Sequence, residues 1–224
     1  MLYTVYTERG LGVQIWGTYD DLRTLYEVIS RFWSVPEFEH IEAFENRNEL
    51  ISSFSYEVRK GMEGSRLTKK SSHFSEEENQ YYGFEVSWVH ILFSIVALKE
   101  NWKLIPPDKL DLAYFYTLEY WVESGLDGFD SVTGAKVKPY LNGGIYAANS
   151  LLYQFMRQIN LKFFLLGGGK NAFKKLPELL KASAYSTPEF NELNMHLQKE
   201  ATRLGVKPEC LDFDEGNSIY EVKW

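Results

Sequence analysis

Two short segments near the start of the chain, 2–7 and 11–16, alternate between apolar and polar residues. This alternation is typical of half-buried β-strands, and Gly10 between the segments favours a tight connection, so together they predict a β-hairpin. The segment 81–88 alternates in the same way and predicts a third strand. The segment 219–224 predicts a terminal strand that could pair with the hairpin.

Longer segments of the chain have apolar residues three and four positions apart, the spacing of amphipathic helices. The first helix is expected after Thr18, with Asp21 in a capping-box position, and Pro36 should end it. The best-marked helix is the last, which Thr187 should cap and Gly205 should stop. Further helices are expected over 37–62 (with a break at 45–49), 89–100, 108–123 and 145–159, and 126–142 is rich in turn residues.

The order of these elements predicts an α+β fold. Strands and helices do not alternate as they would in a doubly wound parallel sheet. We expect a small, mainly antiparallel sheet of about three to five strands, packed against a larger helical layer. The polar stretch near 65–80 should be a surface loop, and no second domain is indicated, so 1–224 are interpreted as one globular domain.

Composition and charge narrow the classes of function. The chain has 224 residues, 16% of them aromatic, and many of these side chains must be buried. Lys and Arg number 24 against 31 Asp and Glu, a formal net charge of -7, which disfavours nucleic-acid binding and could steer a basic partner. The longest strongly apolar stretch, 88–98, is too short to span a membrane. With one cysteine, Cys210, and no signal-peptide pattern, a cytoplasmic location is expected.

Motifs for metal binding are incomplete. No two of the four histidines lie three or four residues apart; they are His40, His73, His90 and His196. His40 has three glutamates nearby and could join them as a metal ligand, but a solvated acidic helix face is the commoner arrangement. His90 begins an apolar helix and is expected to be a satisfied core residue. We therefore predict no metal site and no cofactor.

Motifs for phosphate binding and nucleophilic catalysis are also incomplete. Gly167–Gly169 precede Lys170, but Phe164 and Asn171 stand where a phosphate-binding loop needs glycine and Ser or Thr, so a sharp chain reversal is the better interpretation. No Gly-x-Ser-x-Gly segment occurs. The segment 157–181 holds six basic residues and one acidic residue, which could bind an anionic ligand or an acidic partner, or simply face solvent. The chain shows no catalytic residue and is more consistent with a protein that is not an enzyme.

The helix expected over 108–123 carries most of the candidate ligand-binding residues. Asp111 and Glu119 fall broadly along one stripe of this helix, and Tyr116 and Tyr120 are among the aromatic residues that crowd it. Paired carboxylates inside an aromatic pocket could bind a ligand or transfer a proton. The alternative is an otherwise buried helix that turns its one polar stripe towards water.

Arg59 is the remaining candidate, and it lies on a helix beside an apolar face. Its guanidinium could anchor a carboxylate or a phosphate. It could equally pair with Glu57 or Glu63 on the surface, where such pairs contribute about 0–1 kcal/mol.

Three segments form a recognisable combination: GVQIWGTYDDL at 12–22, FSYEVRKG at 54–61, and YY at 81–82 leading to VSW at 86–88. This combination resembles an uncharacterised family of bacterial proteins known only as a domain of unknown function. The resemblance covers about the first hundred residues. It implies a bacterial source and carries no activity, cofactor or catalytic residue.

Two classes of function follow from these observations. The first is a non-catalytic binding or interaction protein with a possible protein partner, and one form of it is an immunity-type protein that neutralises a basic toxin. The second is a small-molecule sensor or an enzyme, with an aromatic pocket that contains carboxylates.

Overall fold

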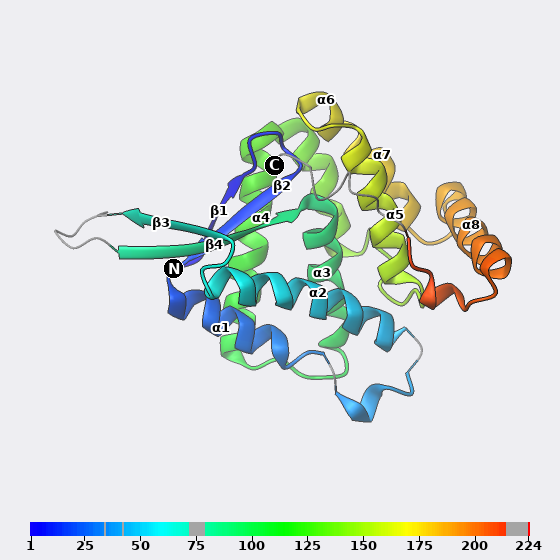
Figure 1. Ribbon diagram of the computed structural model, residues 1–224, viewed down its shortest axis with the longest axis horizontal. Coiled ribbons are helices and arrows are strands. Elements are labelled where there is room, and N and C mark those ends of the chain that lie inside the picture. Colours follow the sequence, from blue (N-terminus) through cyan, green and yellow to red (C-terminus); the bar gives the residue numbers. More distant parts are fainter. Residues whose placement is uncertain (34, 42, 72–78, 214–223) are drawn as a thin grey trace.

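The computed structural model describes residues 1–33, 35–41, 43–71, 79–213 and 224. Within this part of the chain the strands form one antiparallel sheet in the order β1-β2-β4-β3 (Figure 1). The strands are β1 (Tyr3–Tyr6), β2 (Gly12–Gly17), β3 (Leu67–Ser71) and β4 (Asn79–Ser87). The expected hairpin is β1–β2, and its register pairs Tyr3 with Trp16.

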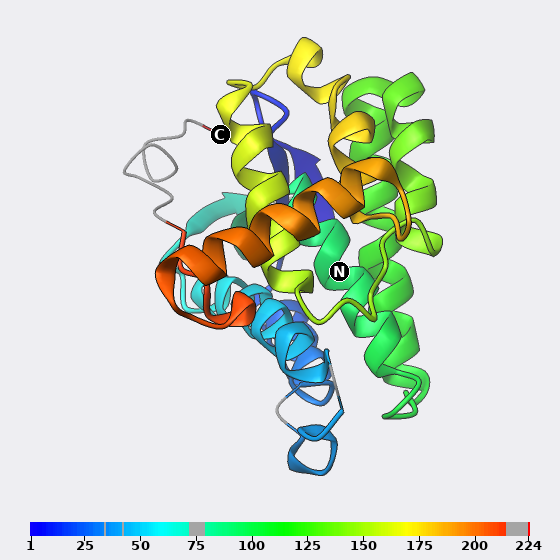
Figure 2. The same ribbon diagram turned by 90° about the vertical axis from the view of Figure 1, so that its right-hand side faces the viewer.

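Helices surround this sheet and make up most of the described chain. They are α1 (Tyr19–Ser30), α2 (Phe44–Met62), α3 (Trp88–Asn101), α4 (Lys109–Val137), α5 (Leu152–Leu165), α6 (Lys170–Phe173), α7 (Leu176–Leu180) and α8 (Pro188–Leu204). Figure 1 shows α1 and α2 side by side, and the far ends of β3 and β4 extending beyond the helices. Figure 2 shows α8 crossing α5, where Phe155 and Phe190 pack ring against ring. The α+β prediction, with a small sheet packed on a larger helical layer, is confirmed.

The alternating pattern of the strands decides which face of the sheet is buried. Val13 and Ile15 of β2 lie opposite Val86 and Phe84 of β4, and all four side chains are buried. Helix α3 follows β4 without a connecting residue and is itself almost wholly buried around Trp88. The sheet and the helices therefore share one hydrophobic core.

The helix caps that the sequence predicted are present. Thr18 and Asp21 form a reciprocal capping box at the start of α1, and the hydroxyl of Thr187 accepts a hydrogen bond from the backbone N–H of Phe190 at the start of α8. Gly205 ends α8 with a φ of 67°. These ends agree with the sequence because a cap is a local interaction.

Other boundaries differ from the prediction. The break expected at 45–49 is wrong, because α2 runs through it from Phe44. The stretch expected to be turn-rich, 126–142, contains a kink of α4 at Asp130, but it is otherwise helical as far as Val137. Helix α5 begins at Leu152 rather than near 145. Strand β3 lies inside the stretch near 65–80 that was expected to be a loop. Of the strand expected at 219–224, residues 219–223 lie outside the described residues.

No helix in the described ranges is both long enough and apolar enough to cross a membrane.

Candidate functional site

Asp111 lies at the start of α4, where it is a structural partner. Its side chain is fully buried and accepts a hydrogen bond from the backbone N–H of Asp108 (2.8 Å). The guanidinium of Arg31 donates a further bond to it at 3.0 Å. The carboxylate thus joins the end of α1 to the first turn of α4.

Glu119 also has a cationic partner. The ammonium of Lys99 lies 2.5 Å from its carboxylate and also donates to the backbone carbonyl of Leu141. Tyr116 and Tyr120, in contrast, stand on the surface of α4, with 59% and 63% of their area exposed. The two carboxylates are therefore paired with cations, whereas the two tyrosines are exposed to solvent. A ligand-binding role for these four residues stays a prediction.

Arg59 lies on α2. Its guanidinium stacks over the ring of Tyr56, 5.4 Å from the ring centroid. It forms a long ion pair with Glu63 at 3.9 Å. These contacts fit the surface pairing that the sequence left open, and an anchoring role for Arg59 towards an anion also stays a prediction.

A cavity of about 610 Å³ lies beside the part of β4 that runs beyond the first residue of β3. The register of β3 begins at Leu67, opposite Gly83, while β4 runs on to Ser87. Helices α2, α3 and α5 border the remaining space. The lining residues are Ser53, Glu57, Ser65, Arg66, Leu67, Glu85, Val86, Ser87, His90, Asn160, Phe164 and Trp224.

Ser87 organises the polar floor of this cavity. It is the N-cap of α3, and its hydroxyl oxygen accepts a hydrogen bond from the backbone N–H of His90 (3.0 Å). The same hydroxyl donates to Oδ1 of Asn160 on α5 at 2.6 Å. One serine thus ends the strand, starts the helix and ties both to α5.

His90 carries an unused polar atom at this floor. Its Nε2 is buried and has no hydrogen-bond partner among the described residues. Burial lowers the pKa of the imidazole from 6.5 to about 4, against the opposing effects of the Glu57 charge and the Leu50 backbone. The ring is therefore neutral at pH 7, and in the tautomer that keeps its proton on Nδ1 the Nε2 atom is an acceptor. The expectation of a satisfied core histidine is wrong for this atom.

Charged groups line the wall of the cavity. Glu57 holds Arg66 through two hydrogen bonds of 2.8 and 3.0 Å, and this partner raises the pKa of the guanidinium. Glu85 accepts a hydrogen bond from the amide of Gln14 (2.9 Å), whose oxygen accepts one from the indole N–H of Trp16 (3.2 Å). Arg66 thus has an acidic partner, whereas the partner of Glu85 is uncharged.

These groups can bind a ligand. The hydroxyl of Ser87 donates to an amide oxygen, which is not a base that removes a proton. A histidine with a pKa near 4 is a weak general base at neutral pH. A buried acceptor, a carboxylate and aromatic rings can nonetheless fix a ligand in place.

The sequence contained a partial signal for this site. Ser87 stands directly before an apolar helix and three residues before His90, which is the spacing of a serine cap. The contributions of Asn160, Phe164 and Trp224 come from distant parts of the chain, and no local pattern connects them to His90.

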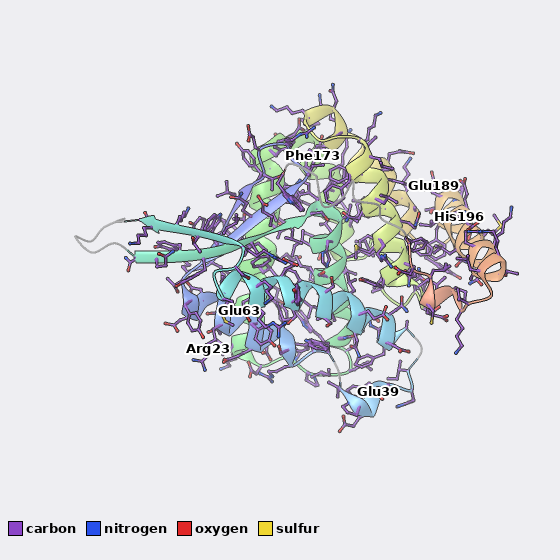
Figure 3. All side chains as sticks on the ribbon, in the orientation of Figure 1. Arg23, Glu39, Glu63, Phe173, Glu189 and His196 are labelled. Atoms are coloured by element: carbon purple, nitrogen blue, oxygen red, sulfur yellow. The ribbon has the colours of Figure 1, made fainter. Side chains whose placement is uncertain are left out.

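A second, more acidic cavity of about 540 Å³ lies at the other end of α2. Its lining includes Glu39, Glu45 and Glu49, and burial together with the charge of Glu45 raises the pKa of Glu49. Figure 3 shows Glu39 and Glu63 at opposite ends of this helix. In the part of the chain that the structure covers, no three His, Cys, Asp or Glu side chains are arranged to hold a metal ion.

The glycine loop packs against the hairpin turn. Gly167, Gly168 and Gly169 all have φ near 80°, which favours glycine, and the backbone carbonyl of Arg9 accepts a hydrogen bond from the N–H of Gly169 (2.5 Å). A side chain at Gly168 would come within 2.9 Å of the same carbonyl oxygen. The loop is the sharp reversal that the sequence indicated.

The basic segment 157–181 begins within α5, and several of its side chains have partners. Arg157 donates to the side chain of Asp212 and to the backbone carbonyl of Phe213, both at 3.1 Å, and Lys181 pairs with Glu178 at 2.7 Å.

Comparison with known proteins gives a family and no activity. No curated protein and no solved structure matches the chain. A family model described as "Domain of unknown function (DUF6904)" matches residues 2–224, which extends well past the first hundred residues in which the sequence resemblance was seen. This match includes the residues of the sheet, the helix caps and the cavity. Because it covers nearly the whole sequence, the chain belongs to the Domain of unknown function (DUF6904) family.

Proposed function

We propose that this protein is a non-catalytic binding protein that holds a small molecule in the cavity at the junction of β4 and α3. The observation that carries the proposal is the buried Nε2 of His90, which has no partner among the described residues and belongs to a residue that lines the cavity. A buried polar atom without a partner costs about 1–3 kcal/mol. A small rotation of the imidazole that brings this atom to a donor on the ligand offsets that cost.

The size and lining of the cavity support this function. Ligand sites generally have volumes of roughly 300–1,000 Å³ and combine apolar walls with a few polar groups. Here Phe164 and Trp224 supply aromatic surface, their rings 5.5 Å apart and nearly perpendicular. Ser87, His90 and Asn160 supply polar groups that are fixed by the start of a buried helix.

A thermal-shift screen with small molecules tests the proposal. A ligand at 100 times its dissociation constant adds about 2.7 kcal/mol, which raises the melting temperature of a chain of this size by about 5–10 °C. The substitution His90→Phe keeps an aromatic ring and removes the acceptor, so it should reduce the shift. His196→Phe is the matched control, because His196 is exposed on α8 (Figure 3).

A second variant tests the same cavity independently, so that the test does not depend on the folding of His90→Phe. Ser53→Trp places a large side chain in the lining without touching the core, and it should abolish the ligand shift while the melting temperature of the free protein stays similar. If ligands stabilise wild type and Ser53→Trp equally, they bind elsewhere and the proposal is refuted.

The proposed setting is the bacterial cytoplasm. It is supported by the resemblance in the first hundred residues and by the single cysteine, which is consistent with a reducing compartment. A protein partner stays part of the proposal. For an immunity-type role, the net charge of -7 is the supporting observation, and binding of a basic protein that fails in high salt is its test.

A further inference from the structure

We infer that the cavity at the β4–α3 junction selects small organic cations, with an ammonium group next to an aromatic or apolar part. The inference rests on the proposed function, since it names the ligand class of the same cavity.

The charges of the described lining residues favour a cation. Glu57 is neutralised by Arg66 through two hydrogen bonds, and the imidazole of His90 is uncharged at neutral pH. Within the described residues, Glu85 accepts a hydrogen bond from the neutral amide of Gln14 and forms no ion pair. One carboxylate charge is therefore left without a cationic partner among these residues, and an anion entering the cavity would be repelled by it.

The hydrogen-bonding groups of the lining also favour a cation. An ammonium group has three N–H donors and no acceptor. The lining supplies an acceptor that matches it, the carboxylate of Glu85, and it includes His90, whose buried Nε2 has no hydrogen-bond partner among the described residues. The hydroxyl of Ser87 already donates to Asn160, and two nitrogens of Arg66 already donate to Glu57, so these donors are in use.

The aromatic wall adds a second attraction for the same ligand. Phe164 and Trp224 both line the cavity. The faces of aromatic rings attract cations, tryptophan most strongly, and they also pack against an apolar ligand body. At longer range the formal charge of -7 raises the local concentration of cations near the protein.

Three probes of similar shape separate charge from shape: 2-phenylethylamine, 2-phenylethanol and phenylacetate. Binding of each to the full chain would be measured by calorimetry and by ¹⁵N shifts of the His90 ring in 50 mM salt at pH 7. We expect the amine to bind at least tenfold more tightly than the alcohol, and the carboxylate to bind least. The amine should also move the Nε2 signal of His90.

Substitution of one carboxylate tests the assignment of Glu85. Glu85→Gln should weaken binding of the amine about tenfold, which corresponds to about 1.4 kcal/mol, and leave binding of the alcohol unchanged. Glu192→Gln is the matched control, because it changes the net charge equally at an exposed position of α8, and it should change affinity less than twofold.

The outcomes distinguish the ligand class from the site. If the alcohol or the carboxylate binds as tightly as the amine and moves the His90 signal, the cavity is a binding site but the cation inference is overturned. Equal loss of affinity in Glu85→Gln and Glu192→Gln also overturns it, since the effect is then one of net charge. If no probe binds and no broader panel moves the His90 signal, both the inference and the proposed function fail.

Discussion

Replacing Asn101 by leucine should destabilise the fold more than removing the buried charge of its partner, Arg47. Arg47 lies in α2 and is 3% exposed. Its Nε donates to Oδ1 of Asn101 at 2.6 Å and its Nη1 donates to the carbonyl of Ala147 at 3.3 Å, while the amide of Asn101 donates to the carbonyl of Phe32 at 2.7 Å. Burial lowers the pKa of Arg47, and the charge of Glu100 opposes that effect.

The two variants should differ in stability because only Asn101→Leu leaves a charged group buried. In Asn101→Leu the guanidinium stays buried without its shortest hydrogen bond, a loss that costs about 3–5 kcal/mol for a buried charge. In Arg47→Met the charge is gone, and the two groups left unpaired are neutral oxygens that cost about 2 kcal/mol together, at the low end for such atoms. The double variant should cost less than Asn101→Leu alone, because it leaves no buried cation behind.

Urea unfolding followed by tryptophan fluorescence measures these free energies, provided that the denaturant slope is unchanged among the variants. Arg203→Met is the control, since Arg203 forms an exposed pair with Glu200 on α8 and should contribute less than about 1 kcal/mol. If Arg47→Met costs as much as Asn101→Leu, or if the two effects simply add, then the buried charge is not what the asparagine stabilises.

Three other predictions follow from the structure. The free energy of unfolding should fall by up to about 3 kcal/mol as the pH drops from 6.5 towards 4. The reason is that His90, whose folded pKa is about 4, stays neutral in the fold while the unfolded chain takes up a proton. His90→Gln should flatten this dependence when urea unfolding is measured at a series of pH values. Gly83→Ala should destabilise the fold by about 1–3 kcal/mol, because its Cβ would come within 2.7 Å of the Trp16 ring. Gly128→Ala should stabilise α4 by about 0.5–1 kcal/mol, because its Cβ meets nothing closer than 3.4 Å. Melting temperatures of the two variants that move in the same direction would contradict this pair of predictions. Asp111→Ala should cost about 2–4 kcal/mol of stability, because it removes a buried carboxylate with two donors, and a variant as stable as wild type would show that this carboxylate is free for another role.

Local interactions were the part of the fold that the sequence predicted well. Thr18 and Thr187 cap helices through contacts within three residues, and the alternation around Val13 and Ile15 reports burial on one face of one strand. Such signals need no knowledge of the rest of the chain. Their success explains why the fold class could be derived from the sequence.

The turn-rich stretch after Glu123 was misinterpreted for an instructive reason. Asp130 has an extended backbone (φ -158°, ψ 102°) inside α4, and its carboxylate accepts a hydrogen bond from the N–H of Thr133, as a helix cap does. The turn signals therefore mark a kink rather than the end of a helix. A Cβ at Gly134 would come within 2.8 Å of the Asp127 carboxylate and 3.1 Å of the Leu126 backbone, so the half of α4 after the kink packs back against the half before it.

The candidate site depends on contacts that no local pattern contains. The cavity exists because β3 begins only opposite Gly83, and because Asn160 and Phe164 lie on a helix some seventy residues away from Ser87. The carboxylates of Asp111 and Glu119 drew attention in the sequence, whereas in the fold they pair with Arg31 and Lys99.

Strand β4 passes into helix α3 between Ser87 and Trp88 with no residue between them. The hydroxyl of Ser87 bonds both to the N–H of His90 and to Asn160, and these two bonds oppose a change of the backbone angles at the boundary. The backbone of His90 is therefore held by the ladder on one side and by a buried helix on the other. The backbone that carries the binding groups is therefore in place before a ligand enters, so binding to this cavity should need movement of side chains and little movement of the backbone.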